Sequence, residues 1–145
     1  MFLIRRFTPT DYEKVIEIEK EAFNEFNPLL FMMAYDSASD GFLIAENNGC
    51  AIGFIVGVVS ASDEVRILSL AVSTVYQNRG IATALLKKFI EIYRAKGILS
   101  IKLEVRASNL RAQKLYMSLG FNTVKIIPSY YTDGEDGFQM VKLLI

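Results

Sequence analysis

The 145 residues of this chain are 52% hydrophobic, which suits one compact domain over residues 1–145 with a sizeable core. Sixteen basic and sixteen acidic residues cancel, so no net charge draws the protein to nucleic acid or to an anionic membrane. The absence of histidine and the single cysteine exclude Ser-His-Asp hydrolysis, Cys-His catalysis, His-containing metal sites and an internal disulfide.

The N-terminal half predicts a strand, a helix and an antiparallel meander. Met1–Arg6 is unlike a signal peptide and no apolar run approaches about 18 residues, so we expect a soluble cytoplasmic protein without a membrane partner. Leu3–Phe7 is apolar enough for a strand, and Thr10–Glu13 has the pattern of a capping box for a helix that ends near Asn24. Further elements are expected in this order: a short helix at 29–35, a polar loop at 37–41, and strands at 42–46, 50–60 and 65–72.

The C-terminal half changes to alternating strands and helices. A helix over Ile81–Lys96, closed by Gly97, separates the strand that ends at Val72 from a strand at about 98–106. This crossover is long enough for a parallel, right-handed pair. The buried face of the helix is expected to consist of Leu85, Leu86, Phe89, Ile92 and Tyr93. Further along, we expect Asn109 to cap a helix that ends at Gly120, followed by strands at 121–127 and 138–144. Together these elements predict one mixed sheet covered by helices.

The loop before the Ile81 helix has the features of an anion site. The helix opens with Ile81–Ala84, which contains no acidic side chain to complement the unbonded amides and partial positive charge of a helix N-terminus. Gly80 has no side chain to hold a diphosphate away from the backbone, and Arg79 adds a permanent positive charge. Such a loop suits the phosphates of a nucleotide or of coenzyme A, whereas no GxxxxGK[ST] or GxGxxG segment occurs in the chain.

Two motifs resemble the GCN5-related N-acetyltransferases, and the resemblance covers nearly the whole chain. Gln77–Ala82 is similar to the Q/R-x-x-G-x-G/A acetyl-CoA loop of that superfamily. Leu103–Asn109, followed by Leu115–Tyr116 and Leu119–Phe121, resembles the protein N-terminal acetyltransferases, including the bacterial enzymes that acetylate the N-terminal alanine of a ribosomal protein. The resemblance implies an α/β (α+β) fold with a mixed, mostly antiparallel sheet, helices on both faces, and a central parallel strand pair splayed to admit acetyl-CoA.

The resemblance also implies specific roles for individual residues, with acetyl-CoA as cosubstrate and no metal. Glu104 is expected to take the proton of the incoming amine through water, and Tyr116 to protonate the departing coenzyme A thiolate. From the residues alone, the pattern favours a solvated strand face with Lys102 and Arg106 for Glu104, and a core position for Tyr116. The implied cofactor contacts are Leu70, Ala71, Val72, Gln77, Asn78, Arg79, Gly80, Ile81, Ala82, Thr83 and Asn109.

The acceptor amine is expected to be the N-terminus of a protein or peptide. An α-amine has a pKa near 8 against about 10.4 for lysine, so far more of it is neutral at pH 7 when only a weak base is present. The segments Phe26, Asn27, Pro28 and Tyr130, Tyr131 match those that hold the peptide in similar enzymes. A ribosomal protein is one candidate substrate. Two alternatives remain open, a small-molecule acetyltransferase acting on a polyamine or drug amine and a non-catalytic acyl-CoA sensor. Asp133, Glu135 and Asp136 keep the polyamine option open.

Overall fold

The computed structural model describes residues 1–23 and 40–145. The predicted helix at 29–35 and the proposed peptide-binding residues Phe26, Asn27 and Pro28 lie outside the described residues. The helical elements are η1 (Pro9–Asp11), α1 (Tyr12–Phe23), η2 (Thr74–Tyr76), α3 (Ile81–Ala95) and α4 (Leu110–Ser118). The strands are β1 (Leu3–Arg6), β2 (Phe42–Asn47), β3 (Cys50–Ala61), β4 (Glu64–Val72), β5 (Ser100–Arg106), β6 (Asn122–Ile127) and β7 (Gly137–Leu143).

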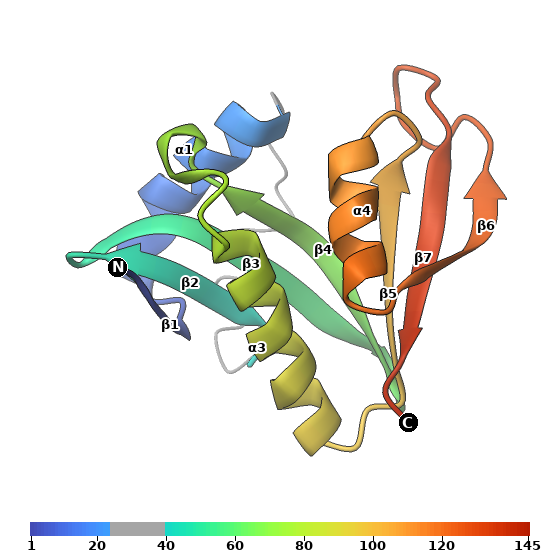
Figure 1. The fold of residues 1–145 in the computed structure, drawn as a ribbon, viewed down its shortest axis with the longest axis horizontal. Helices are drawn as coiled ribbons and strands as arrows, with labels where there is room; N and C mark the ends of the chain where they lie inside the picture. Colours follow the sequence, from blue (N-terminus) through green and yellow to red (C-terminus); the bar gives the residue numbers. More distant parts are fainter. Residues whose placement is uncertain (24–39) are drawn as a thin grey trace. The chain divides into compact units, whose positions relative to one another are not determined.

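The strands form a seven-stranded mixed sheet in the order β1-β2-β3-β4-β5-β7-β6 (Figure 1). The pairs β1–β2, β2–β3, β5–β7 and β6–β7 are antiparallel. β4 and β5 are parallel, as predicted, through the pairs Glu64–Ser100, Val65–Ile101 and Arg66–Lys102 near the start of both strands. The predicted mixed α/β class is therefore confirmed.

The described chain groups into two compact units. The first comprises Met1–Val58 and Leu68–Ile92, and the second comprises Val59–Ile67 and Tyr93–Ile145. The division passes through β3, β4 and α3, so each unit contains one part of these elements. A single domain over residues 1–145 stays a prediction.

In the first unit, helices cover both faces of the sheet. Val15 and Ile18 of α1 belong to a buried cluster with Phe54 on β3. The next residue back along that strand, Gly53, faces the other way because side-chain positions alternate. A Cβ on Gly53 would lie 3.3 Å from Ile81, the first residue of α3, so glycine permits the close approach of this helix. Figure 1 shows α3 crossing β3 on this side.

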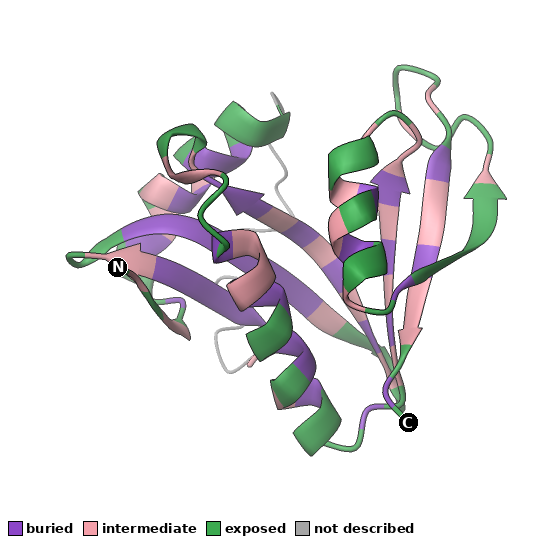
Figure 2. Cartoon of the chain, viewed as in Figure 1, coloured by how far each residue is buried: buried purple, intermediate pink, exposed green. Residues whose placement is uncertain are grey.

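In the second unit, β5 alternates as predicted (Figure 2). Ile101, Leu103 and Val105 are buried on one face. α4 is attached to the end of this strand by Gln113, whose side-chain amide donates to the carbonyls of Arg106 and Ala107 at 3.0 Å each. The edge strand β6 is exposed along almost its whole length.

Two local predictions require correction. The capping residues are Thr8 and Asp11 instead of Thr10 and Glu13, because Pro9 occupies the first position of a short 3-10 turn ahead of α1. The Asp11 carboxylate accepts the Thr8 N–H at 2.8 Å. In α3, Ile92 is only partly buried, whereas Ile90 is buried in its place.

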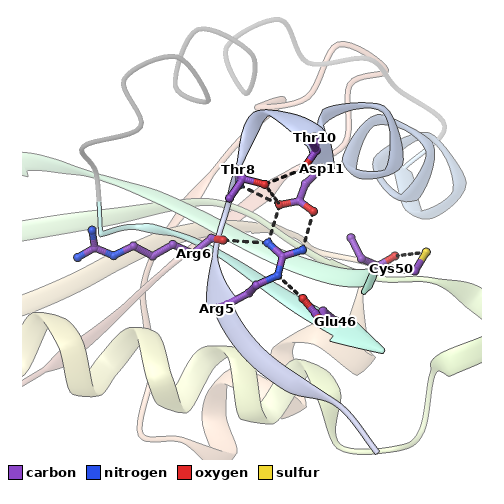
Figure 3. Close-up of polar contacts among 8 residues, drawn as sticks. Arg5, Arg6, Thr8, Thr10, Asp11, Glu46 and Cys50 are labelled. Carbon is purple, nitrogen blue, oxygen red and sulfur yellow. Dashed lines mark hydrogen bonds and ion pairs between the residues drawn. The ribbon is translucent and has the colours of Figure 1, made fainter. Parts of the chain in front are cut away.

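Arg5 holds β1, η1 and β2 together (Figure 3). Its two terminal nitrogens each donate to the Asp11 carboxylate at 2.7 Å, and its Nε donates to Glu46. Burial alone would raise the pKa of Asp11, whose side chain is 6% exposed, but the hydrogen bonds from Arg5 and Thr8 outweigh burial and lower it.

Candidate active site

The loop between β4 and α3 is the segment that the sequence predicts as an anion site. Asn78 and Gly80 both adopt left-handed backbone conformations, with φ of 63° and 79°. Nothing lies within 4 Å of the position that a Cβ would occupy on Gly80, so the glycine faces open space. This residue is required by the backbone conformation and not by packing.

The start of α3 presents backbone donors and a cation. The first backbone hydrogen bond of the helix runs from Ala84 N–H to Gly80 O at 3.0 Å. The N–H groups of Ile81, Ala82 and Thr83 lie before it, at the open end of the helix. The first turn contains no acidic residue. The exposed Arg79 guanidinium lies 5.4 Å from the centre of the Tyr76 ring. A cavity of about 240 Å³ beside the loop is lined in part by these two side chains and Ile81. The combination favours a phosphate ligand.

A carboxylate from α1 holds the short turn that precedes this loop. Glu21 accepts hydrogen bonds from both the backbone N–H and the hydroxyl of Thr74, the first residue of η2. These hydrogen bonds lower the pKa of Glu21. Ser73, the N-cap residue, makes no capping bond with its own side chain. Glu21 therefore caps the turn from a different helix.

The end of β4 contains polar groups that suit an amide-rich ligand. Ala71 and Val72 are buried and Leu70 is partly buried. Gln77 donates from its side-chain amide to the Val72 carbonyl at 3.3 Å, which ties the loop to the strand end. Among the described residues, Ser69 Oγ is the one buried side-chain polar atom without a hydrogen-bond partner, at 9% residue exposure. Such an atom is costly unless a ligand or water satisfies it, so this strand end fits the pantetheine arm of acetyl-CoA.

Glu104 is not part of a solvated charged face. Its side chain is only 7% exposed. One carboxylate oxygen pairs with Arg66 of β4, and the other accepts from Gln139 of β7 at 3.0 Å. Its strand neighbours are paired elsewhere, Lys102 with Glu64 and Arg106 with Asp133 and Glu135. The solvated-face interpretation is therefore wrong, and Arg66 and Gln139 are site residues that sequence reasoning missed.

Tyr116 lies on the inward side of α4, as predicted. It is 8% exposed, and its ring packs edge-on against Phe121 with centroids 5.6 Å apart. Burial raises the pKa of its hydroxyl, with a further contribution from Tyr131. The hydroxyl is therefore protonated at neutral pH, which is the state that a proton donor needs.

The two tyrosines before β7 occupy different environments. The Tyr130 hydroxyl accepts from Arg66 at 3.1 Å, while the residue is 42% exposed. Tyr131 packs edge-on against Tyr130 with centroids 4.9 Å apart, and the Arg106 guanidinium lies 4.1 Å from its ring centre. Burial raises the pKa of Tyr131 to about 12. The Tyr131 hydroxyl can therefore hydrogen-bond a ligand in its neutral form.

The acidic residues of the same loop fold it and are already engaged. Arg106 donates to Asp133 at 2.8 Å and to Glu135 at 2.9 Å. Glu135 also accepts the Ser108 N–H at 2.8 Å, and Asp136 accepts the Ser129 N–H at 3.0 Å. The pKa of Glu135 is lowered chiefly by its hydrogen bond from Ser108, with a smaller contribution from Arg106. The pKa of Asp133 is lowered chiefly by the hydrogen bond from the Glu135 backbone, with a smaller contribution from Arg106.

The predicted site residues thus fall into two sets, one in each unit. In the first unit, Leu70–Val72 and Gln77–Thr83 meet at the end of β4. In the second unit, Arg66 joins Glu104 to Tyr130. Asn109 caps α4, as predicted, by accepting the Ala112 N–H at 3.1 Å. No cluster of side chains that could hold a metal ion occurs in residues 1–23 and 40–145. Over the same ranges, every helix is too short or too polar to span a bilayer.

Comparison with known proteins gives matches over most of the chain. A model of the acetyltransferase (GNAT) family matches residues 9–121. An N-alpha-acetyltransferase of Sulfurisphaera tokodaii is 34% identical over 96% of this chain and 91% of that protein. The structure of Ard1 from Thermoplasma volcanium is similar with a TM-score of 0.93 at 30% identity, over 99% of this chain and 98% of that one. The ribosomal-protein-S18-alanine N-acetyltransferase from Escherichia coli has a TM-score of 0.85 at 32% identity, over 99% and 94%.

Proposed function

The chain belongs to the GNAT family of acetyltransferases and is an acetyl-CoA-dependent N-acetyltransferase, and we propose that its acceptor is the α-amine of a protein N-terminus. Acetyl-CoA supplies the acetyl group as a thioester, which the amine attacks directly while both substrates are bound. The N-alpha-acetyltransferase name of the Sulfurisphaera relative supports this acceptor class. The Escherichia coli relative acts on ribosomal protein S18, which makes a ribosomal protein one candidate substrate here.

The cofactor phosphates are proposed to bind the loop before α3. The amides of Ile81, Ala82 and Thr83 would donate to them, and Arg79 would contribute its positive charge. Gly80 keeps the backbone open to the ligand. The strand end at Leu70–Val72 would pair with the amides of the pantetheine arm.

Glu104 is proposed to accept the proton of the incoming amine through a water molecule. Each of its carboxylate oxygens makes one hydrogen bond and keeps further acceptor capacity. A carboxylate is a weak base at neutral pH, so it removes a proton through water more easily from an α-amine, whose pKa is near 8, than from lysine, whose pKa is about 10.4. Tyr116 would donate its proton to the departing thiolate, since its buried hydroxyl remains protonated.

The choice between a peptide and a polyamine acceptor rests on the partners of the carboxylates in the loop before β7. A polyamine site needs carboxylates that are free to bind ammonium groups. Asp133 and Glu135 instead share Arg106, and Asp136 accepts a backbone N–H of its own loop. Tyr130 and Tyr131 offer hydroxyl groups in the same loop, which suit the backbone of a peptide better than a polycation. This favours an N-terminal acceptor over a polyamine.

A turnover experiment distinguishes an enzyme from an acyl-CoA sensor. Acetylation of a short peptide that begins with alanine should be followed by mass spectrometry, because the exposed Cys50 would react with a thiol reagent. We expect turnover with the wild type and a large loss with Glu104→Gln. Tight binding of acetyl-CoA without any peptide acetylation would contradict the proposal and favour a sensor.

A further inference from the structure

We infer that Arg66 is a positioning residue for the proposed acetyl transfer, because it holds Glu104 and Tyr130 with one guanidinium group. The inference rests on the proposed function and concerns the part of the site that lies within the second unit. Arg66 lies directly before the run Ile67–Val72 on β4, in which every residue except Ser69 is apolar. Neither the loop motif nor the acid and base residues identified from the sequence include it.

The register of the sheet explains why Arg66 reaches Glu104. Arg66 lies opposite Lys102 in the parallel β4–β5 pair, and Glu104 is two residues further along β5 on the same face. The guanidinium therefore reaches along β5 past Lys102, by two residues, to Glu104. On the other side of β5, Gln139 lies directly opposite Glu104 in the antiparallel β5–β7 pair. The carboxylate is thus held from both neighbouring strands.

A single nitrogen of Arg66 makes both contacts. The same Nη2 atom donates to Glu104 and, at 3.1 Å, to the Tyr130 hydroxyl. A guanidinium nitrogen carries two hydrogens in a fixed plane, so these two contacts use both of them. The proposed base and the proposed peptide-binding loop are therefore oriented by the same rigid group.

The burial of this pair distinguishes it from an ordinary surface ion pair. The Glu104 side chain is 7% exposed and that of Arg66 is 34% exposed. Exposed ion pairs hold their partners weakly, whereas a buried carboxylate with two fixed donors has little freedom to turn. A second ion pair on the same strands, Lys102 with Glu64 at 2.8 Å, includes neither Glu104 nor Tyr130 and provides a matched control.

The test compares Arg66→Met and Arg66→Lys with Lys102→Met, after thermal melting shows that each variant is folded. For Arg66→Met we expect kcat for an alanine-starting peptide to fall at least tenfold and KM for the peptide to rise, with KM for acetyl-CoA within twofold. Arg66→Lys should recover part of kcat, because the charge remains but the planar double donor is lost. Lys102→Met should keep kcat within twofold.

The pH dependence of kcat supplies a readout that a merely structural role would not move. Besides Arg66, the groups around Glu104 are Tyr130 and Tyr131 from the loop and Gln139 from β7, with Lys102 and Arg106 on its own strand. Arg66→Met removes the cation that pairs with this carboxylate, so the acidic limb of its kcat profile should differ from that of Lys102→Met. An unchanged limb together with an unchanged kcat, or a raised kcat, would overturn the inference.

Hydrogen exchange tests the same coupling without any activity. The amides of Tyr131 and Gly134, which bond within the loop at 3.1 and 2.9 Å, should exchange at least threefold faster in Arg66→Met than in Lys102→Met. Equal exchange in the two variants would contradict the coupling. If the wild type acetylates no peptide, the proposed function fails, and the exchange comparison still decides whether Arg66 orders the loop.

Discussion

Replacement of Gly80 by aspartate should weaken acetyl-CoA binding chiefly through charge, and asparagine at the same position is the matched control. Gly80 has a φ of 79° and faces open space, so neither side chain meets a steric clash. Asparagine and aspartate adopt left-handed conformations more readily than other non-glycine residues, and their sizes are nearly equal. The backbone strain of the two variants is therefore similar, and the difference between them isolates the added negative charge.

The expected magnitude follows from the distance between the new carboxylate and a phosphate in the loop. At about 5 Å, two unit negative charges repel by about 0.8 kcal/mol in bulk water and about 3.3 kcal/mol at an effective dielectric constant of 20. These energies correspond to roughly 4-fold and 250-fold weaker binding. An intermediate loss of about 30-fold is expected, because the loop is exposed at Arg79 but backed by the buried Ile81.

Thermal melting with acetyl-CoA measures this loss. At a concentration 100 times the wild-type Kd, the ligand should stabilise the wild type by about 2.7 kcal/mol, and a 30-fold weaker variant by about 0.9 kcal/mol. The Tm shift should fall from roughly 10 °C to roughly 3 °C in Gly80→Asp, while Gly80→Asn retains most of it. Equal Tm shifts in the two variants would show that the phosphates do not bind at this loop.

Three further predictions concern the acid and base, the peptide loop and the fold. Glu104→Gln and Tyr116→Phe should each lower kcat about 10²- to 10⁴-fold, or roughly 3 to 5 kcal/mol, with calorimetric affinity for acetyl-CoA nearly unchanged; a loss under threefold in either variant would reject that role. Tyr131→Ala should lower kcat/KM for alanine-starting peptides at least tenfold, about 1.4 kcal/mol, whereas the exposed neighbour Thr132→Ala should not, and equal effects would argue against a peptide contact. Asp11→Asn should cost about 3 kcal/mol in denaturant unfolding, because the partly buried Arg5 loses the charge of the buried carboxylate that accepts from both of its terminal nitrogens. Since folding lowers the pKa of Asp11, its contribution should be complete above about pH 4 and disappear as pH falls further; a wild type and variant that differ equally at pH 7 and pH 3 would contradict this.

Much of the fold could be predicted because local patterns determine it. The sequence Asn47-Asn48-Gly49 is typical of a hairpin turn, and Asn48 and Gly49 in the turn between β2 and β3 have φ of 52° and 79°. Gly97, with φ of 80°, follows α3 as expected. The correct position of the capping box could also have been predicted, since Thr8-Pro9-Thr10-Asp11 has a Pro in the first helical position. The similar Thr10–Glu13 pattern competed with it.

The partners of Glu104 could not be predicted from local patterns. They depend on the cross-strand register, which places Gln139 opposite Glu104 and Arg66 one step away. Alternation along β5 predicted which face the carboxylate occupies, but not that neighbouring strands would bury it. One indication was present, namely a charged Arg66 in a strand whose following residues are almost all apolar. Such a charge usually needs a partner on an adjacent strand.

The acceptor is the central claim, and one competition experiment tests it most directly. The wild-type protein should be given equal concentrations of an alanine- or serine-starting peptide, the same peptide with a blocked N-terminus and an internal lysine, and spermidine. We expect kcat/KM for the free N-terminus to exceed that for either other amine at least tenfold. Faster acetylation of the blocked peptide or of spermidine would contradict the assignment of a protein N-terminus as substrate.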